Sequence, residues 1–137
     1  MTADVVFVTP ETPVNRIARI MVERNVSGLP VVDDARRVVG IVTDLDLIVR
    51  NTRLEPPAFF QLLDARIPLE TLGALARDVM TEKVVTIGPD ADAEAVATLM
   101  VRRKVNPIPV VEAGRLVGIV SRADVVRLMA QELEPAE

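Results

Sequence analysis

The chain has 137 residues, half of them hydrophobic, and its 20 acidic and 16 basic side chains give it a net charge of −4 at neutral pH. This length suits one domain, or two small ones that share a core. An acidic chain with three Phe and no Trp or Tyr lacks the basic surface that nucleic acids and anionic membranes require, and the rings on which bases stack. We therefore expect neither nucleic acid nor a membrane as a partner.

Cysteine and histidine are both absent from the sequence. Their absence excludes disulfides, Cys-His and Ser-His-Asp nucleophilic chemistry, and most zinc sites. No apolar run is long enough to span a bilayer, and the first residues lack the pattern of a secretion signal. We expect a cytoplasmic protein that is not an enzyme and that requires no metal or cofactor.

The chain opens with an apolar stretch at residues 5–8 that predicts a short strand, ended by Pro10. Thr12 can then cap a helix that has Pro13 at its first position. Apolar residues follow at the spacing of one helical face: Val14, Ile17, Ala18, Met21 and Val22.

Two apolar runs come next, at residues 29–32 and 38–42, and the polar turn between them predicts a β-hairpin. A last helix is expected from Asp44 to about Arg50. The first unit, residues 1–51, therefore has the order strand, helix, strand, strand, helix.

Residues 52–79 form a connecting segment that is too apolar to be predicted as disordered. Pro56-Pro57 ends the preceding helix and can begin another, which would carry Phe59 and Phe60. A further helix is expected from Leu69 to Val79. This segment would cover the core or form an oligomer contact.

Residues 80–131 repeat the first unit, first with a shift of 79 positions and then, after one extra residue near Ala35, with a shift of 78. The repeat predicts a short strand at residues 84–87, a helix that starts near Asp90 or Asp92, a hairpin formed by residues 108–111 and 116–120, and a helix from Arg122 to Gln131. Residues 132–137 are expected to be a frayed tail. A unit present only twice predicts two halves that share one core. The identical pairs include Pro10/Pro89, Met21/Met100, Pro30/Pro109, Val31/Val110, Gly40/Gly118, Ile41/Ile119, Val42/Val120 and Asp46/Asp124.

Each unit carries the pattern Gly-Ile-Val-(Thr/Ser)-x-x-Asp, at residues 40–46 and 118–124. A hydroxyl at a helix start with an acid three residues later can form a capping box, worth about 1 kcal/mol of helix stability. The same helix start offers backbone N–H groups and a partial positive charge that suit a phosphate. The residues by themselves leave both interpretations open.

Two such units, each with a Pro-Val-Val strand and the Gly-Ile-Val-(Thr/Ser)-x-x-Asp ending, resemble a pair of CBS domains, also called a Bateman module. Arg77-Asp78-Val79-Met80-Thr81 is similar to the lead-in of that family. The resemblance implies an α+β fold of two pseudo-symmetric β-α-β-β-α repeats that pack through their sheets, leave two clefts and are joined by a helical segment. It also implies a regulatory module that binds AMP, ADP, ATP or S-adenosylmethionine, forms a homodimer and acts on an effector that the sequence does not identify.

The family pattern assigns roles by position. Asp46 and Asp124 would bind the ribose, because a carboxylate can accept hydrogen bonds from both the 2′ and 3′ hydroxyls. The residues placed at the phosphate are Thr43, Ser121, Arg122, Ser27 and Asn106. Those placed around the adenine are Thr9, Val26, Gly28, Leu29, Pro30 and Ile41 in the first repeat and Thr86, Val105, Pro107, Ile108, Pro109 and Ile119 in the second.

The two copies differ directly after the hydroxyl, where Asp44 stands in the first and Arg122 in the second. Only the second copy therefore places a cation beside the expected phosphate. Asp44 with Asp46 would repel a polyphosphate, and would better suit a neutral tail, a sulfonium or a metal-bridged phosphate. We expect the copies to bind unequally. The basic run at residues 102–104 is interpreted as cations at a helix C-terminus.

Two other functions compete with the regulatory one. A dimerisation or scaffold module without a ligand would use Thr43, Asp46, Ser121 and Asp124 only as helix caps. An enzyme with Asp46 and Asp124 as paired acids is less favoured, because carboxylates that start equivalent helices need not come within catalytic distance.

Overall fold

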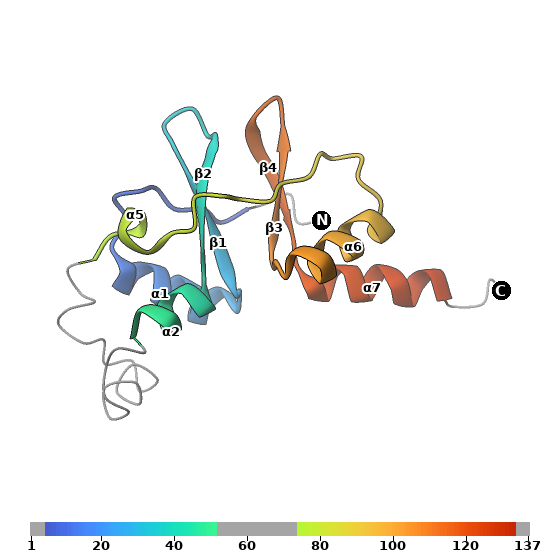
Figure 1. The fold of residues 1–137 in the computed structure, drawn as a ribbon, viewed down its shortest axis with the longest axis horizontal. Helices are drawn as coiled ribbons and strands as arrows, with labels where there is room; N and C mark the ends of the chain where they lie inside the picture. The colour runs from blue at the N-terminus through green and yellow to red at the C-terminus, as the bar shows by residue number, and fades with distance from the viewer. Residues whose placement is uncertain (1–4, 52–73, 134–137) are drawn as a thin grey trace. The chain divides into compact units, whose positions relative to one another are not determined.

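A computed structural model of the chain describes residues 5–51 and 74–133. The described residues form an α+β fold of two compact units (Figure 1). Val6–Val84 makes up the first unit, and Val85 onward, together with Val5, makes up the second. Each unit has its own antiparallel hairpin and its own hydrophobic cluster.

In the first unit, α1 (Val14–Arg24) leads to a hairpin of β1 (Gly28–Val32) and β2 (Val38–Thr43), which is followed by α2 (Asp44–Asn51) and α5 (Ala76–Val79). The hairpin and the bounds of α2 confirm the prediction to within one residue. The register places Gly28 opposite Thr43 and Pro30 opposite Ile41. The core of this unit consists of Val8, Val14, Ile17, Met21, Leu29, Val31, Val42, Leu47, Ala76 and Val79.

The second unit repeats this order with α6 (Ala93–Arg103), β3 (Ile108–Glu112), β4 (Arg115–Val120) and α7 (Arg122–Leu133). Its hairpin turns through Ala113 and Gly114, both at positive φ, the backbone of a type I′ turn. Helix α7 reaches Leu133, so the predicted tail begins with helical residues; residues 134–137 lie outside the described part. The core consists of Val96, Met100, Ile108, Val110, Val120 and Val125.

Of the two side chains predicted to cap the first helix of a repeat, one does so and the other does not. Asp92 caps α6, since its side chain accepts a hydrogen bond from the Ala95 N–H at 2.8 Å. The predicted Thr12 cap is wrong, because Pro13 is in an extended conformation and α1 begins only at Val14. The Thr12 hydroxyl instead accepts a hydrogen bond from the Thr9 N–H at 3.0 Å. The basic residues Arg102 and Arg103 do lie in the last turn of α6, as interpreted.

The opening strand predicted for each repeat is reduced to a single bridge. Val8 pairs in parallel with Val31, and Ile87 pairs in the same way with Val110. Each bridge consists of two backbone hydrogen bonds, at 3.0 and 2.9 Å for Val8 and at 3.1 and 2.8 Å for Ile87. Pro10 and Pro89 follow closely, and a proline has no N–H with which to extend the pairing.

The helix predicted from Leu69 to Val79 ends where expected but starts later in its described part. Ala74 and Leu75 are not helical, because Leu75 is extended and pairs with Pro13. Helix α5 contains only Ala76–Val79. The rest of this prediction, and the helix expected after Pro57, lie outside the described residues.

The segment that contains α5 packs against the first unit. The Ala76 N–H donates to the Thr12 carbonyl at 2.8 Å, and Thr81 pairs with Ile41 on β2. Gly40 lets this segment come close, because a Cβ at that position would lie 2.5 Å from the Met80 sulfur. The lead-in of the second repeat is therefore part of the core of the first unit.

Among the helices of residues 5–51 and 74–133, none is both long enough and apolar enough to cross a bilayer.

Candidate functional site

The first candidate site is the junction at which β2 ends and α2 begins. The Thr43 N–H donates to Asp46 Oδ2 at 2.8 Å, and the Asp46 N–H donates to Thr43 Oγ1 at 3.2 Å. The Thr43 hydroxyl also donates to Asp46 Oδ2, at 3.1 Å. These reciprocal bonds form a capping box, so that interpretation of Thr43 and Asp46 is confirmed.

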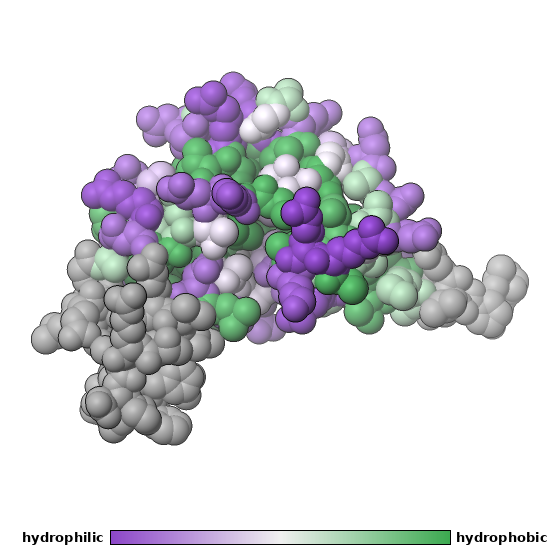
Figure 2. Space-filling view, viewed as in Figure 1, coloured by the Kyte–Doolittle hydropathy of each residue, from purple (hydrophilic) through white to green (hydrophobic). Residues whose placement is uncertain are grey.

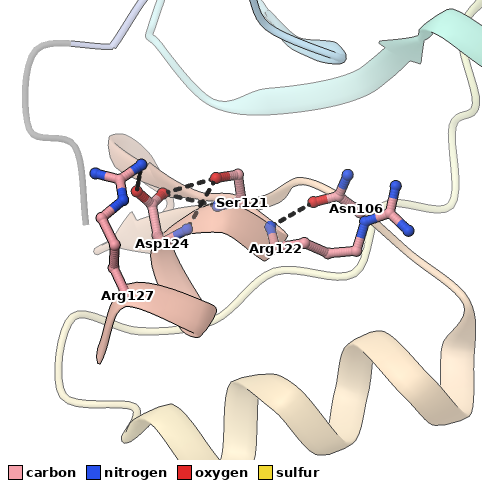
Figure 3. A network of polar contacts seen from close by, with 5 residues as sticks. All are labelled: Asn106, Ser121, Arg122, Asp124 and Arg127. Atoms are coloured by element: carbon pink, nitrogen blue, oxygen red, sulfur yellow. Dashed lines mark hydrogen bonds and ion pairs between the residues drawn. The ribbon is translucent and has the colours of Figure 1, made fainter. Parts of the chain in front are cut away.

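The second unit builds the same arrangement between β4 and α7. The Ser121 N–H and hydroxyl donate to Asp124 Oδ2 at 2.9 and 3.1 Å, and the Asp124 N–H donates to Ser121 Oγ at 3.3 Å (Figure 3). Both hydroxyl–carboxylate pairs are therefore caps in this structure, each fixing the orientation of its carboxylate. Corresponding hydrogen-bond lengths at the two junctions agree to within about 0.1 Å.

The other oxygen of each carboxylate has a different partner in the two units. Asp46 Oδ1 accepts a hydrogen bond from the Thr81 hydroxyl at 3.3 Å. Asp124 Oδ1 lies 3.6 Å from the guanidinium of Arg127, whose side chain is 74% exposed. An ion pair as exposed as this one contributes little free energy. A ligand hydroxyl could therefore compete for Oδ1 while Oδ2 keeps the helix capped.

Sequence reasoning did not single out Thr81 and Arg127 as neighbours of the two carboxylates. Arg127 follows Asp124 by three residues on one helix, a spacing at which side chains meet. That signal was present in the sequence. Thr81 is 35 residues from Asp46, and only the docking of the segment onto β2 brings the two together.

Ser27 and Asn106 each lie beside a helix start, as their assignment requires. The Asp44 N–H donates to the Ser27 carbonyl at 2.8 Å, and the Arg122 N–H donates to Asn106 Oδ1 at 2.8 Å. The first backbone N–H group of the helix therefore donates to a main-chain oxygen in the first unit and to a side-chain oxygen in the second.

Backbone donors at the start of α2 are engaged within the protein. The N–H groups of Thr43, Asp44 and Asp46 have the acceptors described above, and the Leu45 N–H donates to Asp44 Oδ1 at 2.7 Å. A phosphate that bound to them would have to replace these bonds and would meet the charge of Asp44. This end of α2 is therefore poorly suited to a phosphate.

The start of α7 has a different charge. Figure 3 shows the Arg122 guanidinium on the Asn106 side of the junction, with Arg127 on the side of Asp124. Asp44 and Val49 occupy the corresponding sequence positions in the first repeat. With one cation on each side of it, the second junction is the better anion site.

The residues assigned to the adenine pocket lie on or next to the hairpins. Gly28, Leu29 and Pro30 form the start of β1, and Ile41 faces Pro30 across the hairpin. Pro109 and Ile119 are paired in the same way in the second unit, with Ile108 beside them. The Leu29 and Ile108 side chains belong to the cores, so a ligand could reach these two positions only through the backbone.

The remaining assigned residues are less buried. Thr9 and Thr86 are exposed, and each lies next to the bridging residue of its unit. Val26 is exposed and Val105 is half-buried, and both precede the first strand of their hairpin. Pro107 is buried directly before β3.

Comparison with known proteins places the chain in a family. Residues 1–50 and 76–131 match the family model described as CBS domain. The chain is a member of the CBS domain family, with two repeats in tandem.

Two curated relatives and one solved structure show how far the likeness extends. The CBS domain-containing protein CBSX2, chloroplastic, of Arabidopsis thaliana is 34% identical over 90% of this chain and 58% of the relative. Inosine-5'-monophosphate dehydrogenase of Korarchaeum cryptofilum is 35% identical over 89% of this chain and 22% of that protein. The crystal structure of CBSX2 in complex with AMP is 32% identical, with a TM-score of 0.78, over 98% of this chain and 95% of that one. The chain thus spans only part of the length of these curated relatives.

Proposed function

We propose that the chain is a regulatory module that binds an adenosine-containing ligand, with Asp46 and Asp124 as the residues that bind ribose. The observation that carries the proposal is the duplicated carboxylate, held in place through Oδ2 with Oδ1 in a weaker contact. A similar protein, CBSX2, has been crystallised with AMP. A fixed carboxylate suits a ribose diol because it needs no reorganisation to accept two hydrogen bonds.

The charges at the two junctions favour different ligands. Arg122 and Arg127 suit the phosphate of a nucleotide at the second junction. Asp44 and Asp46 suit a neutral or cationic tail, such as the sulfonium of S-adenosylmethionine, at the first. Ser121 and Asn106 would assist phosphate binding in the second repeat, and the hairpin residues named above would surround the adenine.

The alternative is a scaffold that holds no ligand. It is favoured by the engaged N–H groups at the start of α2, which leave Thr43 and Asp46 with a complete structural role. The binding experiment separates the two functions. Neither function includes a catalytic step.

The decisive experiment is calorimetric titration of the nucleotide-free chain with AMP, ATP, S-adenosylmethionine and deoxyadenosine monophosphate. We expect micromolar binding of AMP and a clear loss of affinity for the deoxy compound, which lacks one ribose hydroxyl. Absence of heat from every compound, with a folded protein, would favour the scaffold.

Asp124→Ala should weaken AMP binding about 10- to 100-fold, because hydrogen bonds to a charged group are worth about 1.5–3 kcal/mol. Asp92→Ala is the matched control, since it removes a capping aspartate from the same unit at a position with no assigned ligand role. Equal affinities of the two variants would contradict the ribose assignment.

We also propose a cytoplasmic homodimer that acts on a separate effector. Hydrophobic residues are visible at the surface along α7 (Figure 2), where Val126 and Met129 are exposed. An exposed apolar helix face of this kind is typical of an interaction surface. Sedimentation equilibrium at several concentrations should give twice the mass of the chain, and Val126→Glu should shift the balance toward the monomer. A monomer at every concentration would exclude the dimer.

A further inference from the structure

Thr81 joins the segment that leads into the second repeat to the candidate site of the first repeat (the first site). Its N–H donates to the Ile41 carbonyl at 2.9 Å, and the Ile41 N–H donates back to the Thr81 carbonyl at 3.0 Å. Its hydroxyl donates to Asp46 Oδ1 at 3.3 Å. Since Ile41 is assigned to the adenine and Asp46 to the ribose, Thr81 contacts a residue from each part of the expected site.

The position of Thr81 is fixed by the segment that carries it. Ala76 and Val79 of this segment are 0% and 7% exposed, within the core of the first unit. The two backbone hydrogen bonds to Ile41 then hold Thr81 against β2. Thr81 itself is exposed, so it is accessible to a ligand.

The Thr81 hydroxyl and Asp46 Oδ1 together form a pair of hydrogen-bond acceptors. A hydroxyl that donates its one hydrogen still has lone pairs with which to accept, and a carboxylate oxygen can accept more than one hydrogen bond. Asp46 Oδ2 is engaged by both the N–H and the hydroxyl of Thr43. Oδ1 and the Thr81 oxygen, 3.3 Å apart, are therefore the acceptors that remain for a ligand. Two neighbouring acceptors match a diol, which presents two neighbouring donors.

A different kind of group meets the equivalent oxygen in the second unit. Asp124 Oδ1 lies 3.6 Å from the guanidinium of Arg127, which has five N–H donors and no acceptor. Arg127 can bind a phosphate or ribose oxygen, but it cannot accept a hydrogen bond from a hydroxyl. Among the residues that the structure describes, the acceptor pair is thus found at Asp46 and not at Asp124.

We propose that Thr81 is a ribose-binding residue of the first site and sets its requirement for a diol. This inference rests on the proposed function, in which Asp46 binds the ribose, and it adds to that site a residue from the lead-in of the second repeat. One ribose hydroxyl donates to Asp46 Oδ1, and its neighbour donates to the Thr81 oxygen. Because Thr81 belongs to the docked segment, a bound ribose also stabilises the docking of residues 74–81 on the first unit.

The test is an NMR titration of the full chain with adenosine, 2′-deoxyadenosine and 3′-deoxyadenosine, in which the amide signals of Thr43 and Asp46 report the first site. Adenosine carries no phosphate, so the charge of Asp44 does not oppose it. Thr81→Val should weaken adenosine binding about three- to tenfold, the usual net worth of one neutral hydrogen bond. It should not weaken binding of the deoxyadenosine that lacks the hydroxyl bound by Thr81.

Two further variants separate contact with the ribose from docking of the segment. Thr81→Ser keeps the hydroxyl and should retain the preference for adenosine. Val79→Ala loosens the same segment without removing a hydroxyl, so it should change the three affinities by the same factor. Equal losses for all three ligands in Thr81→Val would mean that the hydroxyl only holds the segment in place, and would overturn the proposal.

Amide exchange in the unaltered chain gives a second measurement that needs no variant. At equal occupancy of the first site, the Thr81 N–H should exchange about three- to tenfold more slowly with adenosine than with one of the two deoxyadenosines. Equal exchange with all three ligands would overturn the inference. Binding of none of them would overturn the proposed function as well, whereas binding with unaltered affinity ratios in Thr81→Val overturns the role of Thr81 alone.

Discussion

Asp33 shows how much local structure one side chain can set. Its Oδ1 accepts hydrogen bonds from the Ala35 and Arg37 N–H groups, both at 2.9 Å, and its Oδ2 accepts one from the Arg37 guanidinium at 3.1 Å. These bonds close the longer turn of the first hairpin. The second hairpin has no need of such a residue, because Ala113 and Gly114 supply the positive φ angles of a two-residue turn.

The Arg37 N–H, assisted by the Ala35 N–H and the Arg37 guanidinium, lowers the pKa of Asp33 below its ordinary value of 3.8, and outweighs the opposing effect of desolvation. Because the pKa is lower in the folded state, the stabilisation is present above the unfolded value and is lost as the pH falls through the folded one. Asp33→Asn should therefore flatten the fall in unfolding free energy below about pH 4. Urea unfolding across this range measures the effect. Asp34→Asn is the control, and an unchanged acid limb in Asp33→Asn would contradict the prediction.

Secondary structure follows the sequence where the signal is local. The hairpin strands and α2 begin and end within about one residue of the prediction, because alternating apolar runs and a hydroxyl cap act over a few residues. Thr12 and Asp92 gave the same kind of cap signal, and only Asp92 became a cap. The difference arises from residues 74–75, which hold Pro13 and Val14 from outside the helix.

Asp92→Ala should therefore lower the free energy of unfolding by about 1 kcal/mol, the usual worth of an N-cap. Asp90→Ala, which removes the other aspartate near this helix start, should change it by less than about 0.5 kcal/mol. Chemical denaturation of both variants provides the comparison. Equal losses in the two would mean that the cap of α6 contributes nothing specific.

At the scale of the whole molecule, the repeat to which a segment belongs in the sequence is not always the unit in which it packs. Residues 75–81 lead into the second repeat, yet they pair with Pro13 and Ile41 and bury Ala76 and Val79 in the core of the first unit. The Thr81 hydroxyl reaches Asp46 for the same reason. The candidate site of the first repeat therefore includes a residue from beyond the connecting segment.

Val79→Ala should lower stability by about 2 kcal/mol through lost burial and a residual cavity. The loss should fall on the first unit, so that amide exchange accelerates in α1 and α2 more than in α6 and α7. Arg77→Ala, which changes an exposed side chain on the same helix, is the matched control. Faster exchange chiefly in the second unit would refute this account of the packing.

The sequence by itself determined the two repeats, the hairpins, the starts of α2 and α7 and the family, since each depends on residues that are near one another in the chain or on the duplication. Only the tertiary structure decided that Thr12 is not a cap, that the opening strands are single bridges and that Thr81 lies at Asp46. These features depend on which segment docks on which surface. The docking of a segment depends on burial and on backbone pairing between distant residues, and a local sequence pattern does not predict it.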